Sequence, residues 1–299
     1  MKLKAYLERH LLIYRLVVLV GNMICRLVPA RIRVQRRYKK KFGSSLDLES
    51  PQTYNEKLQW MKLYWEDSRA SVCADKYAVR KLVADTIGDK YLNTLFGVYD
   101  SPDQIDFDAL PDSFVIKLTH GSGMNIVCKD KSRLDVVYAR RLLAVWQAMD
   151  YACLKTELVY RNVPRRIICE KFIDTGGEEL RDYRFFCFNG EPKFIAVDLS
   201  ITDKSKTRRN IYDLEWNQMP VRITYPNENE VSIPRPSKLE EMVELSRRLS
   251  AGFPHVRIDF YCEDTVLFGE MTFFHQSGLG IMLPKEFNLQ VGSYLELPA

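Results

Sequence analysis

The segments HVRIDFYC (255–262) and TVLFGEMTF (265–273) decide how this chain is interpreted. Both are rich in β-branched and aromatic residues, so we expect two adjacent antiparallel strands. Side-chain alternation puts Arg257 and Asp259 on one face of the first strand. On the second strand it gives one face to Val266, Phe268, Glu270 and Thr272. Pairing of the strands would therefore bring Asp259 next to Glu270 on one side of a sheet.

Two adjacent carboxylates repel each other unless a cation lies between them. A hard, oxygen-preferring ion such as Mg²⁺ is the usual cation at such a pair. Arg257, beside Asp259, is suited to a phosphate or a developing oxyanion. The alternative is a buried salt bridge in which Arg257 pairs with Asp259 or Glu270, and the pattern leaves both interpretations open.

A second segment with chemical content is FVIKLTHGSGMN at 114–125. A strand delivers Lys117, and the Gly-Ser-Gly loop at 121–123 lets backbone N–H groups approach an anion. The segment matches neither GxxxxGK[ST] nor a GxGxxG that opens a helix. An ordinary turn explains the glycines equally well, and the lysine directly before them favours a phosphate.

The rest of the chain indicates an α+β fold. Thr53-Tyr-Asn-Glu56 and Ser237-Lys-Leu-Glu240 are capping boxes at two expected helix starts. Further helices are expected from Asp75 to Gly88 and over 133–149. Segments 182–188 and 193–199 flank Asn189-Gly190, which predicts a tight hairpin. Because hairpins recur among the helices, we expect an α+β body rather than a doubly wound parallel sheet.

The composition excludes several classes of protein. Seven cysteines lack any CxxC pair or Cys/His cluster, so we expect neither a zinc site nor a disulfide framework, and we expect a reducing compartment. The four histidines lack metal-ligand spacing, and no GxSxG motif is present. A serine hydrolase or a metallohydrolase is therefore not expected.

The basic charge is concentrated in residues 1–41, which contain one acidic residue. Within this arm, Arg15 and Arg26 interrupt the apolar segment 11–30, which is then too short to span a bilayer. Apolar residues recur in a helical stripe at positions 3, 7, 11, 14, 18, 21 and 25. The stripe and the Arg/Lys cluster at 31–41 fit a helix on an anionic membrane surface. They equally fit a core helix followed by a solvated basic loop. No nucleic-acid-reading module is present.

In their order along the chain, these segments resemble the ATP-grasp superfamily. CADKYAVRKLVADTIG (73–88) resembles the helix whose Asp-Lys supplies a nucleotide-binding lysine, here Lys76. FVIKLTHGSG resembles the strand and glycine loop that cover the phosphates, which implicates Lys117, His120, Gly121, Ser122 and Gly123. CEKFID (169–174) resembles the hinge that holds the adenine, which implicates Glu170, Lys171, Phe172 and Ile173.

The later segments extend the resemblance. DYRFF (182–186) resembles the strand that carries an acidic position and an arginine, here Asp182 and Arg184. RIDFY and FGEMTF resemble the paired metal-binding strands, which implicates Asp259, Glu270 and Thr272. Thr272 stands where most members have asparagine, so one firmly held Mg²⁺ is expected. His275 stands where others often have proline, and it is either a substrate contact or a loop residue.

The chain is most similar to the TupA-like branch, which is associated with cell-surface polysaccharide assembly. NEKLQWMKLY (55–64), RNIYDLEWN (209–217) and the SGLGIMLP segment (277–284) carry this likeness. It implies a basic helical region at 1–70 and an ATP-grasp domain at 71–299. In that domain two α+β subdomains, about 113–173 and 182–283, would grip the nucleotide.

The resemblance further implies a carboxylate–amine ligase that uses ATP and Mg²⁺ and passes through an acyl phosphate. Arg257, Lys117 and Arg184 would be its catalytic residues. Its partners would be a small-molecule or glycan carboxylate and an amine, with no nucleic acid. We expect a cytoplasmic protein, peripheral at the inner face of the membrane. The alternatives are a sugar or polyol kinase on the same ATP site, a glycosyltransferase of polysaccharide biosynthesis and a non-catalytic scaffold.

Overall fold

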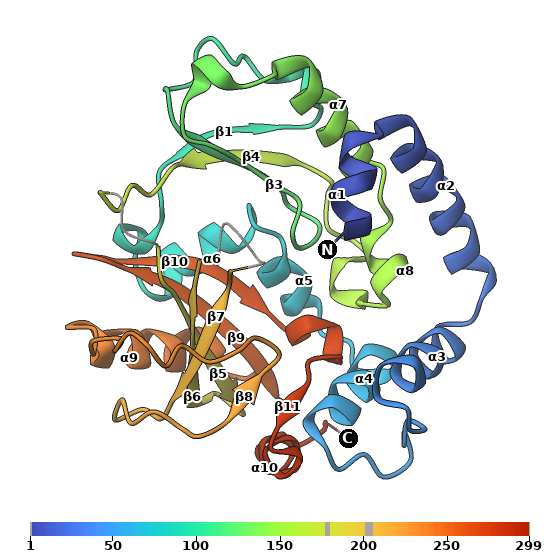
Figure 1. Ribbon diagram of the computed structural model, residues 1–299, viewed down its shortest axis with the longest axis vertical. Coiled ribbons are helices and arrows are strands. Elements are labelled where there is room, and N and C mark those ends of the chain that lie inside the picture. The colour runs from blue at the N-terminus through green and yellow to red at the C-terminus, as the bar shows by residue number, and fades with distance from the viewer. Residues whose placement is uncertain (1, 177–179, 201–205, 299) are drawn as a thin grey trace. The chain divides into compact units, whose positions relative to one another are not determined.

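The computed structural model describes residues 2–176, 180–200 and 206–298 (Figure 1). Its mixture of helices and antiparallel sheets confirms the predicted α+β class. The chain divides into two compact units, each described by itself. Unit 1 contains Met1–Arg37, Glu66–Val79 and Asn93–Phe172; unit 2 contains Tyr38–Trp65, Arg80–Leu92 and Ile173–Ala299. The chain leaves unit 1 for the last time between Phe172 and Ile173, within the predicted hinge. The predicted division at residue 70 stays a prediction.

Unit 1 contains a four-stranded antiparallel sheet in the order β1-β4-β2-β3. Its strands are β1 (Leu95–Tyr99), β2 (Phe114–Leu118), β3 (Asn125–Cys128) and β4 (Ile167–Lys171). Its helices are α1 (Lys2–Arg9), α2 (Leu11–Leu27), α5 (Ser68–Ala74), α7 (Val136–Gln147) and α8 (Tyr151–Lys155). Two helices cross the boundary between the units, namely α3 (Ala30–Phe42) and α6 (Val79–Thr86). Among the described residues, short 3₁₀ helices occupy Pro102–Gln104, Lys131–Arg133 and Leu158–Tyr160 in unit 1, and Asp89–Tyr91 and His275–Gly278 in unit 2.

The core of unit 1 includes the N-terminal arm. One face of the sheet buries Phe114, Ile116 and Leu118 together with apolar side chains of α7. Leu7, Tyr14 and Val18 of α1 and α2 join the same cluster, and Cys25 is also buried. The core-helix interpretation of the arm's apolar stripe is therefore confirmed at these positions. The opposite face of the sheet carries the polar residues Lys117 and Glu170.

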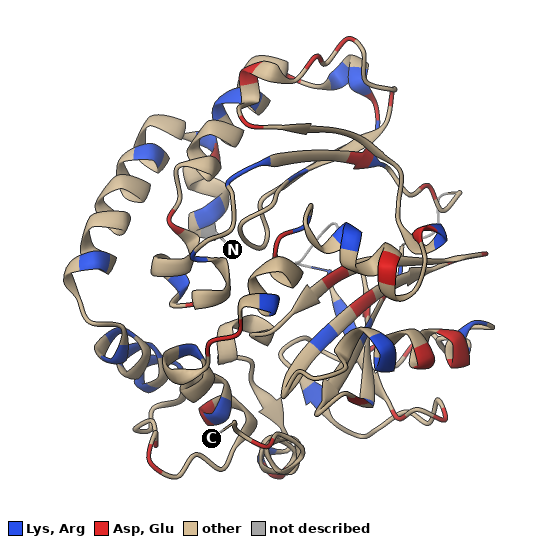
Figure 2. Cartoon of the chain, turned by 180° about the vertical axis from the view of Figure 1, so that it is seen from behind, with Lys and Arg blue, Asp and Glu red and all other residues tan. Residues whose placement is uncertain are grey.

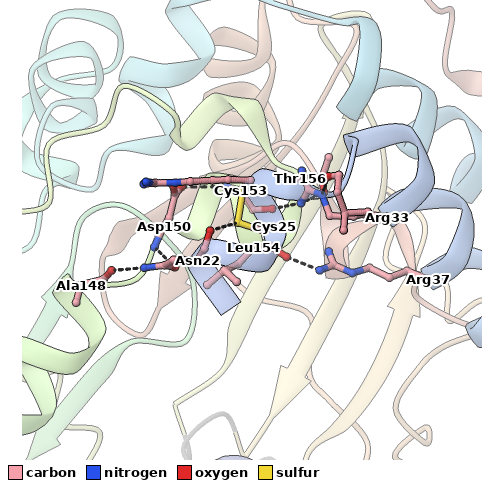
Figure 3. The surroundings of a disulfide bond; sticks show 11 residues. Asn22, Cys25, Arg33, Arg37, Ala148, Asp150, Cys153, Leu154 and Thr156 are labelled. Carbon is pink, nitrogen blue, oxygen red and sulfur yellow. Dashed lines mark hydrogen bonds and ion pairs between the residues drawn. A yellow bond between two sulfur atoms is a disulfide. The ribbon is translucent and has the colours of Figure 1, made fainter. Parts of the chain in front are cut away.

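A disulfide joins Cys25 of α2 to Cys153 of α8, which the sequence analysis, with its expectation of a reducing compartment, did not predict (Figure 3). The two Cα atoms are 5.8 Å apart, and 128 residues separate the cysteines in the sequence. Such a separation has no recognisable sequence pattern, because only the tertiary packing of α2 on α8 brings the two residues together.

Polar contacts around the disulfide also hold the arm (Figure 3). Asn22 Nδ2 donates to the Ala148 carbonyl at 2.9 Å. Arg33 Nη1 donates to Thr156 Oγ1 at 2.9 Å and to the Cys153 carbonyl, and Arg37 Nη2 donates to the Leu154 carbonyl at 2.5 Å. Cations next to the last carbonyls of a helix are favourable. The expected solvated basic loop is thus a helix, α3, and two of its arginines cap α8.

Unit 2 is built on a five-stranded antiparallel sheet in the order β10-β9-β5-β6-β7. Its strands are β5 (Asp182–Phe188), β6 (Glu191–Leu199), β7 (Arg208–Tyr212), β9 (His255–Cys262) and β10 (Val266–Thr272). A small second sheet pairs β8 (Arg222–Ile223) with β11 (Met282–Leu283). Its helices are α4 (Tyr54–Tyr64), α9 (Leu239–Ser250) and α10 (Lys285–Tyr294), of which α9 packs on strands β5, β6 and β9. The predicted Asn189-Gly190 turn is present, with φ of 51° and 81°.

The three predicted helix starts have different outcomes. At α4, Thr53 Oγ1 accepts from the Glu56 backbone and Thr53 N donates to Glu56 Oε2 at 3.0 Å, which confirms the capping box. The prediction of a capping box at Ser237 is wrong. Helix α9 begins after Lys238, and Glu240 pairs with Arg235 instead. The helix expected from Asp75 begins only at Val79, since the Asp75 carboxylate accepts from backbone N–H groups and closes a turn first.

Candidate functional site

The register of β9 and β10 brings the predicted carboxylates together. Asp259 lies opposite Glu270, and Arg257 lies opposite Thr272. A β-bulge falls between Phe268 and Glu270. The extra residue reverses the alternation, so the expectation that Phe268 shares a face with Glu270 is wrong. The bulge directs Glu270 and Thr272 to the polar face, a role that bulges often have near functional sites.

The three predicted metal ligands converge on one cationic nitrogen. Nη2 of Arg257 lies 2.5 Å from Asp259 Oδ2, 3.0 Å from Glu270 Oε1 and 3.1 Å from Thr272 Oγ1. Arg257 Nε also donates to Asp259 Oδ1 at 2.6 Å. The buried salt bridge, one of the two interpretations of the sequence, is therefore present. The oxygen atoms of Asp259, Glu270 and Thr272 surround Arg257 Nη2.

A wider ionic network shares this face of the sheet. Arg184 Nη2 lies 2.6 Å from Asp182 Oδ2, and its Nη1 lies 3.0 Å from Asp198 Oδ2. Arg209 pairs with Asp198 through two contacts of 2.5 and 2.6 Å. Asp182 is buried, and the Arg184 side chain is only 18% exposed.

The sequence analysis missed Asp198 and Arg209. They lie opposite each other on β6 and β7, and Asp198 lies opposite Asp182 on β5. Strand β7 was not predicted, so no pattern could align these residues with the site. In the part of the chain that the structure describes, the network contains four carboxylates and three guanidinium groups. If all are ionised, it carries one excess negative charge.

Burial and neighbouring charges set the protonation of this network. Burial raises the pKa of Asp259 to about 7, although Arg257 acts in the opposite direction. Burial also raises the pKa of Asp182, and Asp198 adds to this effect. Burial disfavours the charge of Asp198 as well, but Arg184 and Arg209 outweigh it and lower its pKa. Asp182 Oδ1 is buried without a hydrogen-bond partner.

The oxygen atoms of these residues are of the type that Mg²⁺ prefers, and in this structure Arg257 Nη2 occupies the point on which they converge. Mg²⁺ takes oxygen ligands in an octahedron and usually keeps several waters, so it needs few protein ligands. Asp259, Glu270 and Thr272 supply three convergent oxygens, and the buried, unpartnered oxygen of Asp182 adds to the negative potential nearby. Among the described residues, no group of three or more His, Cys, Asp or Glu side chains is arranged to hold a metal ion.

His275 supports Arg257. Its Nδ1 lies 2.6 Å from Arg257 Nη1, and its Nε2 lies 3.4 Å from Arg209 Nη1. Burial and the adjacent arginines lower its pKa well below the ordinary value, so the ring is neutral. Both arginines can only donate, and a neutral ring accepts at one nitrogen, so we assign the acceptor to Nδ1 at the shorter contact and the ring proton to Nε2. The 3.4 Å contact with Arg209 is then not a hydrogen bond.

Unit 1 contains the predicted phosphate-binding residues. Lys117 Nζ forms a 2.8 Å ion pair with Glu170 Oε2 across β2 and β4. Lys76 Nζ donates to the Gly121 carbonyl at 2.5 Å, so both predicted lysines lie at the loop or on its strand. The sequence analysis missed Lys4 of α1, whose Nζ donates to the Gly123 carbonyl at 2.6 Å.

The remaining loop and hinge positions have local partners. Burial, with Arg165 and Lys76 adding to it, lowers the pKa of His120 to about 4, so this ring is neutral near pH 7. Ser122 is exposed. In the hinge, Lys171 N donates to the Thr94 carbonyl at 2.9 Å, and Phe172 lies under Lys129 Nζ. Ile173 opens the last segment of unit 2.

Comparisons with known proteins identify the family of this chain. The profile of the family described as TupA-like ATPgrasp matches residues 56–296. No curated protein sequence matches the chain. Among solved structures, an L-amino acid ligase from Bacillus licheniformis is 14% identical, with a TM-score of 0.45 over 83% of this chain and 55% of that one.

Two further structures are similar at this level. A D-alanine–D-alanine ligase from Helicobacter pylori is 14% identical, with a TM-score of 0.43 over 83% of this chain and 68% of that chain. The ATP-grasp ligase PsnB, complexed with a minimal precursor, is 13% identical, with a TM-score of 0.39 over 72% of this chain and 59% of that chain. The chain thus spans less than two thirds of the length of PsnB.

Proposed function

The chain belongs to the TupA-like ATP-grasp family, and we propose that it is an ATP-dependent carboxylate–amine ligase that releases ADP. The observation that carries the proposal is the convergence of Asp259, Glu270 and Thr272 on one point of the unit 2 sheet. A buried carboxylate whose pKa is raised to about 7 needs a cation to stay charged. Mg²⁺ bound to a nucleotide would provide such a cation.

The proposal assigns a task in nucleotide binding to each group of predicted residues. In unit 1, Lys76, Lys117 and the loop 120–123 would bind the phosphates, and 170–172 with Ile173 would contact the adenine. Lys117 would exchange its Glu170 partner for a phosphate oxygen. In unit 2, Asp259, Glu270 and Thr272 would hold Mg²⁺, which when bound neutralises charge on the β- and γ-phosphates.

The proposed reaction has two steps. A substrate carboxylate oxygen attacks the γ-phosphorus, the bond between that phosphorus and the β–γ bridging oxygen breaks, and ADP leaves. The amine then attacks the carbonyl of the acyl phosphate, loses a proton and displaces inorganic phosphate. Arg257 would stabilise the negative oxygen of the tetrahedral intermediate, with His275 holding its guanidinium. Arg184 would balance the carboxylates that surround this site.

Product analysis tests the chemistry. We expect ADP and inorganic phosphate in equal amounts only when an acid and an amine are both present. A stable phosphorylated sugar or polyol, formed without an amine, would instead identify a kinase. Binding of a sugar nucleotide in place of ATP would identify a glycosyltransferase.

A variant pair tests the site. Asp259→Asn combined with Glu270→Gln should abolish the Mg²⁺-dependent stabilisation by ATP in a thermal-shift assay. The matched control is Asp264→Asn combined with Glu263→Gln, two exposed carboxylates at the turn of the same hairpin. Equal stabilisation of both double variants by Mg²⁺ and ATP would exclude the proposed metal site.

The substrate and the location complete the proposal. The acid or the amine would belong to a cell-surface polysaccharide or its precursor, and a panel of uronic acids and amino acids in the thermal-shift assay would identify it. The enzyme would work in the cytoplasm and contact the anionic inner face of the membrane through residues 1–41. ATP is supplied on that side.

A further inference from the structure

Helix α2 has a second apolar face that the core of unit 1 does not use. Tyr14, Val18 and Cys25 are its buried residues. Nine other large apolar side chains of the same helix are exposed, with Leu12 at 87% and Leu27 at 74%. These nine are Leu12, Ile13, Leu16, Val17, Leu19, Val20, Met23, Ile24 and Leu27. A soluble surface rarely gathers so many apolar side chains in one place.

Helical geometry separates the two faces. With about 100° between successive residues, Tyr14, Val18 and Cys25 fall within an arc of about 40°. The nine exposed residues fall within an arc of about 160° centred on the opposite side of the helix. On α2, the buried residues of the apolar stripe seen in the sequence therefore face the protein interior, and the exposed face is a separate feature. Figure 2 shows α2 as a mostly uncharged helix with isolated basic bands.

Cations border this face, and acidic residues are absent from this part of the sequence. Arg15 and Arg26 lie about 40° and about 20° outside one edge of the exposed arc, and Arg26 also pairs with Asp150 at 3.1 Å. Arg31 and Arg36 of α3 are also exposed, whereas Arg33 and Arg37 turn toward α8. No Asp or Glu occurs between Arg9 and Leu46. An apolar face bordered by cations matches the boundary between the acyl chains and the headgroups of an anionic bilayer.

The helix does not meet the requirements for a membrane span. Among the described residues, no single helix is long and apolar enough to cross a bilayer; α1 and α2 pass that test only as a pair bent by 119°. A second copy of the chain is a poor occupant for this face, because a symmetric contact through α2 would bring identical cations together. A bilayer with anionic headgroups instead neutralises them.

We propose that the exposed face of α2 inserts at the interface of an anionic lipid bilayer, with the helix parallel to the surface. The inference rests on the proposed location at the membrane but not on the ligase chemistry. Tyr14 and Val18 in the core and the Asn22 bond to the Ala148 carbonyl hold α2 in unit 1. Arg33 and Arg37 hold the following helix, α3, to α8, so the face is presented by a fixed helix (Figure 3).

The structure also determines which experiment is informative. Removing residues 1–41 would take Leu7, Tyr14 and Val18 out of the core of unit 1, so loss of binding would only report unfolding. Leu16→Glu combined with Met23→Glu places two charges near the centre of the exposed arc and leaves the core intact. Leu289→Glu is the matched control, since Leu289 is 52% exposed on α10. Circular dichroism and thermal melting would verify that each variant is folded.

The assay is co-sedimentation of the full chain with phosphatidylcholine vesicles that contain or lack phosphatidylglycerol. We expect binding that requires phosphatidylglycerol and weakens at about 0.5 M salt, where the headgroup charge is screened. The Leu16/Met23 variant should bind at least roughly tenfold more weakly, and the Leu289 variant should bind like the wild type.

Unchanged binding of the folded Leu16/Met23 variant would overturn the proposal, as would failure of the wild type to bind either vesicle. If the wild type ignores vesicles but dimerises, and the Leu16/Met23 variant is monomeric, the face is a self-association surface and the lipid proposal is wrong. ATP-dependent thermal stabilisation is measured in parallel. Failure of the ligase proposal would remove that stabilisation without changing vesicle binding, so the two failures are distinguishable.

Discussion

Replacement of His255 should change the pH dependence of stability. His255 is fully buried at the start of β9. Its Nδ1 donates to the Cys187 carbonyl at 2.8 Å, and its Nε2 accepts from the Tyr54 hydroxyl at 2.8 Å. Together these bonds connect α4 to the main sheet of unit 2. Burial lowers the pKa of His255 from 6.5 to about 4, with Arg257 acting in the same direction and the bond to Cys187 in the other.

Proton linkage gives the sign and the size of the His255 contribution to the free energy of unfolding. Between about pH 4 and 6.5 the unfolded chain binds a proton at this ring that the folded chain does not, so the free energy of unfolding rises with pH. The contribution is fully present above pH 6.5 and is lost as the pH falls toward 4. When the pH falls from about 7.5 to about 5.0, the free energy of unfolding loses about 2 kcal/mol of this contribution. The total loss, reached below the folded-state pKa, is about 3 kcal/mol.

The assay is urea denaturation followed by tryptophan fluorescence at several pH values. His255→Asn keeps a donor for the Cys187 carbonyl but cannot titrate. It should be destabilised near pH 7.5, and its difference from wild type should shrink by about 2 kcal/mol by about pH 5.0. Tyr54→Phe is the control, because it removes one hydrogen bond and leaves the buried ring. The free energy of unfolding of Tyr54→Phe should be lower than that of the wild type by about 1–2 kcal/mol at every pH. A His255→Asn difference that does not vary with pH would refute the reasoning.

Three further perturbations test local features. Thr53→Ala removes the side chain that caps α4 and should lower the free energy of unfolding by about 1 kcal/mol in urea; no change would mean that the cap contributes nothing. Gly121→Ala would place a Cβ 2.6 Å from Tyr151 Cδ2, so the loop must shift, and titration with a fluorescent ATP analogue should show weaker binding. Reduction of the Cys25–Cys153 bond should lower the free energy of unfolding of unit 1 by about 2–4 kcal/mol. A variant with serine at both positions should match the reduced wild type, and a difference between them would point to another cause.

The sequence by itself determined the local elements and the order of the chemical residues. Alternation in 255–262 and the Asn189-Gly190 turn predict strands because these signals depend on near neighbours only. The capping box at Thr53 is equally local. Strand β7 was missed, and the capping box predicted for the start of α9 did not form, because pairing with β6 and a competing ion pair with Arg235 decide those positions.

Only the tertiary structure decided how the site is assembled. The bulge before Glu270 changes which residues share a face, and the pairing of β5, β6 and β7 adds Asp198 and Arg209 to the network. Strand register and bulges arise from contacts between distant segments, so single-strand alternation does not specify them. The same reason applies to the arm. Its sequence shows an amphipathic helix, but only the packing of α2 in unit 1 shows which apolar face is buried and which is left for another surface.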